Sequence, residues 1–265
     1  MKIAVIGAGP GGLYAALAAA SRGRQVDLYE KRNVGEGIVC GECIFDSLRI
    51  MPRPGRGLLR PVEQVVLKGH QPHSFPLFKH RPLWMLDRKI WQQDLARQAA
   101  DRGVAVYENS KVTPERLGKM QKEYDWVIDA SGAPSVTSRR YQFSGSYFKD
   151  YLLAYQFVVK GDFQNLWPSI QFSFQPDLPA AFQPAYAWIF PKDKQFANIG
   201  IVCTVCTTLD KTRVNLKKRL ADFLRSENLE NANVIEKGGG IATGQTPERL
   251  VCDNILLVGD AAGLT

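Results

Sequence analysis

A glycine-rich segment close to the start of the chain holds residues well suited to binding chemistry. Gly7-Ala8-Gly9-Pro10-Gly11-Gly12 has the spacing G-x-G-x-x-G. In this pattern the first glycine permits a tight turn, the second lets a pyrophosphate approach the backbone, and the third lets a helix pack closely on a strand. Phosphate oxygens can accept hydrogen bonds from the unpaired N–H groups at that helix N-terminus. The segment therefore predicts a dinucleotide-binding turn.

The elements around this turn follow the order that such a site needs. Residues 2–6 form a short β-branched run typical of a buried parallel strand, residues 13–20 predict a helix, and residues 25–29 predict a second strand. The second strand leads into Glu30, whose carboxylate can accept from ribose hydroxyls. Strand, turn, helix, strand and acid in this order favour a dinucleotide site over a plain glycine turn.

Two later segments place an aspartate after an apolar strand. They are residues 125–132 (DWVIDASG) and 254–263 (NILLVGDAAG). In the second, Asp260 lies where the strand gives way to a predicted helix start, so its carboxylate can bind ligand hydroxyls near that helix N-terminus. For both Asp129 and Asp260, the alternative role is that of a helix N-cap.

Two cysteine pairs have a spacing that suits a zinc site or a dithiol. They are Cys40-x-x-Cys43 and Cys203-x-x-Cys206. Residues 196–204 predict a strand, in which residues three apart point to opposite faces, so the second pair cannot share a metal unless the strand breaks. We therefore predict no metal site. Cys40 and Cys43 lie in a glycine-rich loop that permits thiol chemistry.

An aromatic strand and one arginine are further candidates. Residues 184–191 predict an extended strand with Tyr186, Trp188 and Phe190 on one face. That face is either ordinary core or the wall of an apolar cavity. Arg88 begins a predicted helix, where a cation opposes the helix macrodipole, so we expect an anionic partner for it. The alternative is a surface arginine that covers the apolar stripe of its helix.

These elements predict an α/β fold with two domains. A discontinuous, Rossmann-like cofactor domain is expected over residues 1–60, 84–140 and 238–265, and a second domain of α+β type over residues 61–83 and 141–237. The second domain should hold a mostly antiparallel sheet. Its amphipathic helix, within residues 214–229, should place Leu216, Leu220 and Phe223 inward.

Composition limits the classes of protein. With 265 residues, 45% hydrophobic and 23% charged, the chain can bury one large core or two smaller ones and is not disordered in composition. Its formal charge of +8 favours anionic partners. No block of five like charges occurs, so we expect no nucleic-acid partner. Five unevenly spaced cysteines favour a reducing cytoplasm. No uninterrupted apolar run reaches the ~18 residues of a membrane span.

Several of these segments together resemble the flavoprotein group with the para-hydroxybenzoate hydroxylase fold. They are GAGPGG, Glu30, LDRKIWQQDLARQA and LLVGDAAG. Within that group the chain is similar to the geranylgeranyl reductase family in GIVCGE at residues 37–42, in P-x-Y-x-W-x-F-P at residues 184–191 and in Asn198-Ile199-Gly200.

The resemblance implies FAD as the cofactor and assigns roles to particular residues. FAD would be bound by Gly7, Ala8, Gly9, Pro10, Gly11, Gly12, Glu30, Lys31, Gly41, Arg88, Gly259, Asp260 and Gly263. Cys40 would lie near the flavin as the catalytic candidate, and Tyr186, Trp188 and Phe190 would line a cavity for an isoprenoid chain. The family also continues beyond the position of Thr265 with a C-terminal helical region, so we expect this chain to be part of a longer product.

On this resemblance we expect a flavoprotein oxidoreductase of lipid metabolism. It would reduce carbon–carbon double bonds of a geranylgeranyl diphosphate or lipid with hydride from reduced FAD, and NAD(P)H or ferredoxin would supply the electrons. We expect a cytoplasmic location, with peripheral association at the anionic inner membrane surface. One alternative is a flavin-dependent aromatic hydroxylase of the same fold. Another is a flavin-binding or electron-carrying protein without a substrate of its own.

Overall fold

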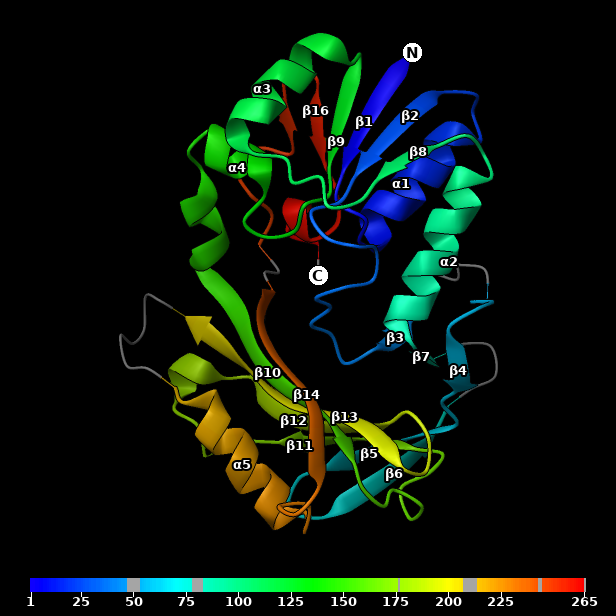
Figure 1. Cartoon of the computed structure of the whole chain (residues 1–265). Helices are drawn as coiled ribbons and strands as arrows, with labels where there is room; N and C mark the ends of the chain where they lie inside the picture. Colours follow the sequence, from blue (N-terminus) through cyan, green and yellow to red (C-terminus); the bar gives the residue numbers. More distant parts are fainter. Residues whose placement is uncertain (47–52, 78–82, 176, 207–213, 243–244, 265) are drawn as a thin grey trace. The chain divides into compact units, whose positions relative to one another are not determined.

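The computed structural model describes residues 1–46, 53–77, 83–175, 177–206, 214–242 and 245–264. They form two compact units (Figure 1). Unit 1 comprises Met1–Ile38, Arg88–Tyr151 and Ala242–Thr265, and unit 2 comprises Val39–Asp87 and Leu152–Ile241. Residues 39–46 and 53–60 were expected in the cofactor domain, but they lie in unit 2, because the strands that they contain pair there with a strand before Arg88.

Unit 1 is built on a six-stranded sheet with the order β15-β16-β9-β1-β2-β8. The strands are β1 (Lys2–Ile6), β2 (Gln25–Tyr29), β8 (Ala105–Tyr107), β9 (Trp126–Asp129), β15 (Val251–Cys252) and β16 (Ile255–Leu257). All neighbours pair in parallel except β15 with β16. Parallel strands bring their carboxyl ends to one edge of the sheet, which is where the glycine turn and both aspartate segments begin.

Helices cover both faces of this sheet (Figure 1). They are α1 (Pro10–Ala20), α2 (Arg88–Ala100), α3 (Pro114–Glu123) and α4 (Val136–Arg140). Helix α3 begins where the Thr113 side chain accepts a hydrogen bond from the Arg116 N–H, and it buries Leu117 and Met120 in a core shared with Ala4 and Ile6 of β1. The expected bounds of β1 and β2 are confirmed, since a short β-branched run next to a glycine turn is a strong local signal.

Unit 2 is built on a seven-stranded sheet with the order β14-β10-β13-β12-β11-β5-β6. The strands are β5 (Gln64–Lys68), β6 (Pro72–Pro76), β10 (Asp150–Lys160), β11 (Ile170–Phe174), β12 (Ala185–Pro191), β13 (Phe196–Cys206) and β14 (Asn233–Ala242). Pairing is antiparallel between β12 and both of its neighbours, while β11 and β5 run parallel. The expected mostly antiparallel sheet is thus confirmed. The triple glycine at residues 238–240, expected in the cofactor domain, lies inside β14 of unit 2.

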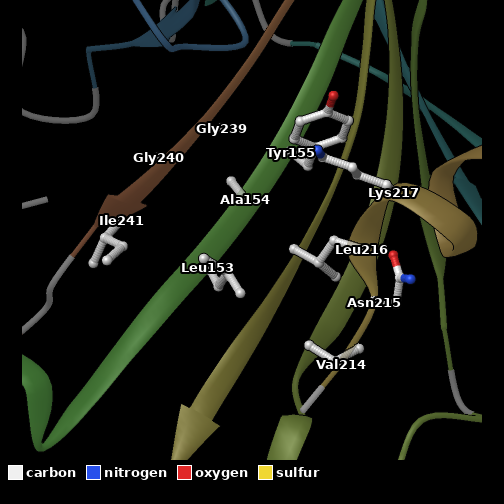
Figure 2. A pocket seen from close by; sticks show the side chains of 10 residues that line it. All are labelled: Leu153, Ala154, Tyr155, Val214, Asn215, Leu216, Lys217, Gly239, Gly240 and Ile241. Atoms are coloured by element: carbon white, nitrogen blue, oxygen red, sulfur yellow. The ribbon is translucent and has the colours of Figure 1, made fainter.

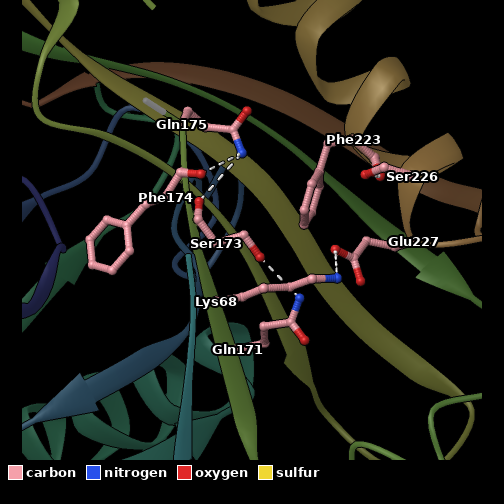
Figure 3. A network of polar contacts seen from close by, with 8 residues as sticks. All are labelled: Lys68, Gln171, Ser173, Phe174, Gln175, Phe223, Ser226 and Glu227. Atoms are coloured by element: carbon pink, nitrogen blue, oxygen red, sulfur yellow. Dashed lines mark hydrogen bonds and ion pairs between the residues drawn. The ribbon is translucent and has the colours of Figure 1, made fainter. Parts of the chain in front are cut away.

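Helix α5 (Leu216–Ser226) packs on one face of this sheet. Its buried side chains include Leu216, Leu220 and Phe223, as its apolar periodicity predicts. Figure 3 shows how the end of α5 is tied to the sheet: Lys68 Nζ on β5 pairs with Glu227 Oε1 at 2.8 Å. Close by, Gln171 Nε2 donates to Ser173 Oγ at 3.0 Å.

A three-stranded sheet of order β3-β7-β4 completes unit 2, from β3 (Cys43–Phe45), β4 (Leu58–Pro61) and β7 (Leu83–Leu86). Arg60 joins β4 to the larger sheet. Its buried guanidinium donates to the carbonyls of Pro191, Pro168 and Ser169. Burial lowers the pKa of Arg60 to about 10.

No helix among the residues with described positions combines the length and the apolar character that crossing a membrane requires.

Candidate functional site

The turn between β1 and α1 has the geometry that its glycines predict. Gly7 has φ +98°, and a Cβ there would lie 2.4 Å from the Ala130 carbonyl oxygen at the end of β9. A Cβ at Gly12 would lie 1.9 Å from the Gly7 carbonyl oxygen. The first turn of α1 therefore packs directly on the strand ends, and no larger residue fits at either position.

The N-terminus of α1 is open to an anion. Its first turn contains no acidic residue, and among the residues that the structure describes no side chain caps it and none comes within 4 Å of a Cβ built on Gly9. Pro10, which has no N–H, occupies the first helical position. The remaining N–H groups and the positive end of the helix dipole face free space beside Gly9, which is the environment that a phosphate needs.

Glu30 is held against the same turn. Its Oε2 accepts from the Ala8 N–H at 2.8 Å, and its Oε1 accepts from the Arg32 N–H at 3.1 Å. These two backbone donors fix the carboxylate beside the glycine turn while each oxygen keeps a further lone pair for a ligand hydroxyl. Lys31 is exposed, and its expected role stays a prediction.

The second glycine-aspartate segment lies next to the first. Residues Gly259–Ala262 form a single 3-10 turn that ends at Gly263, with φ +70°. A Cβ added to Gly11 would lie 3.5 Å from the Cα of Gly259, so two segments nearly 250 residues apart in sequence meet at one place. Asp260 is exposed at the surface, yet the surrounding protein partly desolvates its carboxyl group. This desolvation raises the pKa of Asp260, and the nearby positive charge of Arg88 opposes the rise only in part.

Arg88 is placed by a residue that the sequence did not reveal. Gln92, one turn later on α2, is buried, and its Oε1 accepts from Arg88 Nε at 3.1 Å and from Nη2 at 2.7 Å. Its Nε2 donates to the Ala8 carbonyl at 3.0 Å. Gln92 thus bridges the arginine to the glycine turn. The i, i+4 spacing was visible in the sequence, but the partner in the turn was not.

Asp129 has a different role from Asp260 despite its similar sequence context. Its side chain is completely buried. Oδ1 accepts from the Ser131 N–H at 3.0 Å, and Oδ2 accepts from the N–H and the hydroxyl of Thr137 at 2.7 and 2.6 Å. These bonds tie the end of β9 to α4. Asp129 therefore has a structural role, close to the N-cap alternative.

The aromatic strand of unit 2 divides its side chains between two faces as expected. Trp188 and Phe190 lie in a core with Met85 of β7, while Ala187 and Ile189 lie in the core beneath α5. Phe190 and Trp188 are 7% and 6% exposed, and both rings pack against other buried side chains of unit 2. Tyr186 is more exposed. The role of these three aromatic residues as a cavity wall stays a prediction.

The Cys40–Glu42 loop rests on this aromatic strand. A Cβ at Gly41 would lie 3.0 Å from the Phe190 ring, and the Cys40 carbonyl accepts a hydrogen bond from Asn198 Nδ2 at 2.9 Å. The Glu42 N–H donates to Cys40 Sγ at 3.4 Å. Both Cys40 and Gly41 belong to unit 2, whereas the other expected cofactor residues belong to unit 1. Their expected roles stay predictions.

The other cysteines differ from Cys40. Burial raises the pKa of Cys43 to about 12, partly opposed by Arg60, and raises that of Cys203 to about 11. Strand β13 runs unbroken to Cys206, so Cys203 and Cys206 point to opposite faces. Among the described ranges, no cluster of three His, Cys, Asp or Glu side chains suits a metal ion.

Unit 2 also contains an open pocket of about 510 Å³ (Figure 2). Leu153–Tyr155 of β10, Val214–Lys217 at the start of α5 and Gly239–Ile241 of β14 line it. Aliphatic side chains form most of the lining, and Lys217 lies at one end with its Nζ 5.6 Å from the centre of the Tyr155 ring.

Two models of known protein families match parts of this chain. Residues 1–157, more than half of the chain, match the family model described as pyridine nucleotide-disulphide oxidoreductase. Residues 180–242 match the model described as geranylgeranyl reductase catalytic domain. By the first match, the chain belongs to the pyridine nucleotide-disulphide oxidoreductase family. The second match and the relatives described next support an FAD-dependent oxidoreductase of geranylgeranyl reductase type.

The chain is similar to known proteins in sequence and in structure. The chain is 28% identical to digeranylgeranylglycerophospholipid reductase 1 of Methanosphaera stadtmanae and 29% identical to digeranylgeranylglycerophospholipid reductase 2 of Methanococcoides burtonii. Each match covers 98% of this chain and 68% of the relative. A geranylgeranyl bacteriochlorophyll reductase-like protein of Thermoplasma acidophilum shares the fold, with a TM-score of 0.77 and 23% identity over 99% of this chain and 71% of that one.

The residues of unit 1 fit the cofactor of the geranylgeranyl reductase family. The open helix N-terminus at Gly9 suits the pyrophosphate, Glu30 suits a ribose, and Asp260 lies beside the same helix start. Arg88 supplies a cation close to that group. The sequence predicts each of these residues as a cofactor contact but gives no sign of Gln92, which joins Arg88 to the Ala8 carbonyl.

Proposed function

We propose that this chain is the part of a reductase that saturates carbon–carbon double bonds in the geranylgeranyl chains of a glycerophospholipid. The observation that carries the proposal is the match to two digeranylgeranylglycerophospholipid reductases over 98% of the chain. The closeness of the glycine turn to the Gly259–Asp260 segment supports it, because both segments can then contact one cofactor. These relatives also favour a reductase over the aromatic hydroxylase.

The protein residues contribute binding and orientation. When bound, reduced FAD supplies the hydride that one alkene carbon receives, while a proton reaches the other. We propose that the N-terminus of α1, with Glu30, Arg88 and Asp260, holds the cofactor's phosphates and hydroxyls. We further propose that Cys40 is the catalytic residue, close to the reacting atoms. The reductant is NAD(P)H or ferredoxin.

The isoprenoid chain needs an apolar surface that is open to it. We propose that the pocket at the start of α5 takes part of that chain, because its lining is aliphatic and unit 2 leaves it open, whereas Trp188 and Phe190 are already covered. Ile241→Trp should fill the pocket and raise the KM for prenyl lipid. Ile235→Trp is the matched control, since Ile235 is also exposed on β14 but does not line the pocket. Equal KM values for the two variants would contradict this placement.

We propose that the protein associates with anionic membrane surfaces while it acts on a phospholipid. Its formal charge of +8 supports this, since basic residues gain about 1 kcal/mol each near an anionic surface. Sedimentation with vesicles should show binding to anionic lipid that falls with added salt. Equal binding to neutral vesicles would contradict an electrostatic cause.

An anaerobic turnover experiment tests the activity itself. FAD-loaded protein is reduced with dithionite and mixed with a geranylgeranyl glycerophospholipid or with geranylgeranyl diphosphate. The bound flavin should reoxidise, and the lipid should gain one H2 in mass per reduced double bond. The saturated lipid is the control and should leave the flavin reduced. A flavin that stays reduced with the unsaturated lipid, and a lipid of unchanged mass, would refute the proposal.

A further inference from the structure

Asn198 is a buried amide whose two polar atoms connect two functional candidates. It lies in β13 with no exposed surface. Its Oδ1 accepts from the indole Nε1 of Trp188 at 2.9 Å, and its Nδ2 donates to the carbonyl of Cys40 at 2.9 Å. A buried amide is costly to leave unpaired, so these two bonds fix its orientation.

Trp188 is itself fixed between two glycines. Gly200 lies opposite Trp188 in the register of β12 and β13, and a Cβ there would fall 2.2 Å from the indole. On Gly41, a Cβ would fall 3.4 Å from the indole nitrogen and 3.0 Å from the Phe190 ring. The indole therefore lies against Gly200 and close to the Gly41 backbone. Because its position is fixed, the position of the indole N–H that donates to Asn198 Oδ1 is fixed as well.

The thiol of Cys40 is held from the other end of its loop by Glu42. Glu42 has φ +62°, a left-handed conformation that is unfavourable for a side chain of this size. It is kept there by an ion pair with Lys192 Nζ at 2.8 Å and by the Leu86 N–H, which donates to the Glu42 carbonyl at 2.9 Å. In this conformation the Glu42 N–H points at Cys40 Sγ.

We propose that Asn198 is a positioning residue for the Cys40 thiol. Asn198 bonds Trp188 and the Cys40 carbonyl, and in this way it holds the Cys40–Glu42 loop and restricts the Cys40 sulfur to a single position in unit 2. The inference rests on the proposed function only in giving Cys40 a catalytic role, and the position of the thiol can be measured without turnover.

The first measurement is the rate at which iodoacetamide alkylates Cys40, followed by peptide mass spectrometry. Asn198→Ala should raise this rate about fivefold, the factor that corresponds to losing one net hydrogen bond. Trp188→Phe keeps a ring but loses the indole donor, so it should raise the rate at least about twofold. The control is Gln171→Ala, which removes another buried amide of the same sheet, whose Nε2 donates to Ser173 Oγ. It should lower the melting temperature and leave the rate unchanged.

Two results would overturn the inference. One is an unchanged rate at Cys40 in both Asn198→Ala and Trp188→Phe, and the other is an equal rise in Gln171→Ala. If Asn198→Ala does not fold, Trp188→Phe decides alone.

Measurements of kcat and KM distinguish a failure of this inference from a failure of the proposed function. Asn198→Ala should lower kcat with little change in KM, because it displaces the thiol and not the substrate surface. If Cys40→Ser keeps the wild-type kcat, the catalytic role of Cys40 fails, while the alkylation rates still test whether Asn198 positions it.

Discussion

Gln92 offers a sharp test of how the cofactor site is built. Replacing it with alanine removes two hydrogen bonds to the Arg88 guanidinium and one to the Ala8 carbonyl. A net hydrogen bond is worth about 1 kcal/mol, and one to a charged group about 1.5–3 kcal/mol. Both Arg88 bonds are only part-buried, so water replaces some of this energy. We therefore expect Gln92→Ala to lose about 1.4 kcal/mol of FAD binding, which is a tenfold rise in Kd.

The assay is the quenching of flavin fluorescence on binding to apo-protein. Gln98→Ala is the matched control: it lies on the same helix and donates to Asp94, but contacts neither Arg88 nor Ala8. Gln98 is half-buried and its amide bonds Asp94 rather than the glycine turn, so the FAD Kd of this variant should stay within about twofold of the wild type.

A double-mutant cycle with Arg88→Ala shows whether Gln92 acts through the arginine. If it does, Gln92→Ala in the Arg88→Ala background should add little further loss, because the shared interaction is already gone. Fully additive losses, or an unchanged Kd in Gln92→Ala alone, would refute the reasoning.

Three further outcomes follow from the structure. Gly9→Ala should keep the melting temperature of the wild type but bind FAD at least about tenfold more weakly, because the added methyl group occupies the space for the phosphate. Gly12→Ala is the contrasting variant and should lower the melting temperature, because its methyl group meets the Gly7 carbonyl oxygen. Desolvation by the surrounding protein raises the pKa of Asp260, so the ionised form of its carboxyl opposes folding. Asp260→Asn should therefore raise apo-protein stability at neutral pH and weaken FAD binding, and the stability difference should vanish below the ordinary pKa of Asp; equal stabilities of variant and wild type at neutral pH would contradict this. Because the pKa of Cys43 is about 12, iodoacetamide at pH 8 should alkylate it at least about tenfold more slowly in the native than in the guanidinium-unfolded chain; similar rates would contradict its burial.

Much of the fold could be predicted from the sequence because its signals are local. The bounds of β1 and β2 follow from short apolar runs beside a glycine turn, and the inward face of α5 follows from a 3.6-residue period. The small sheet of β3, β4 and β7 was missed. Its strands are three or four residues long, too short for a period to stand out, and they pair only after the intervening chain has folded back.

The sequence by itself determined which residue types could bind the cofactor: a glycine spacing that admits only one kind of turn, and acids placed directly after strands. It could not separate Asp129 from Asp260, because both follow an apolar strand, and only the nearby Thr137 makes the first structural. Likewise, the roles of Gln92 and Asn198 depend on backbone carbonyls more than 80 residues away. Tertiary packing determines the hydrogen-bond partners of a buried amide, so no short-range sequence pattern can predict them.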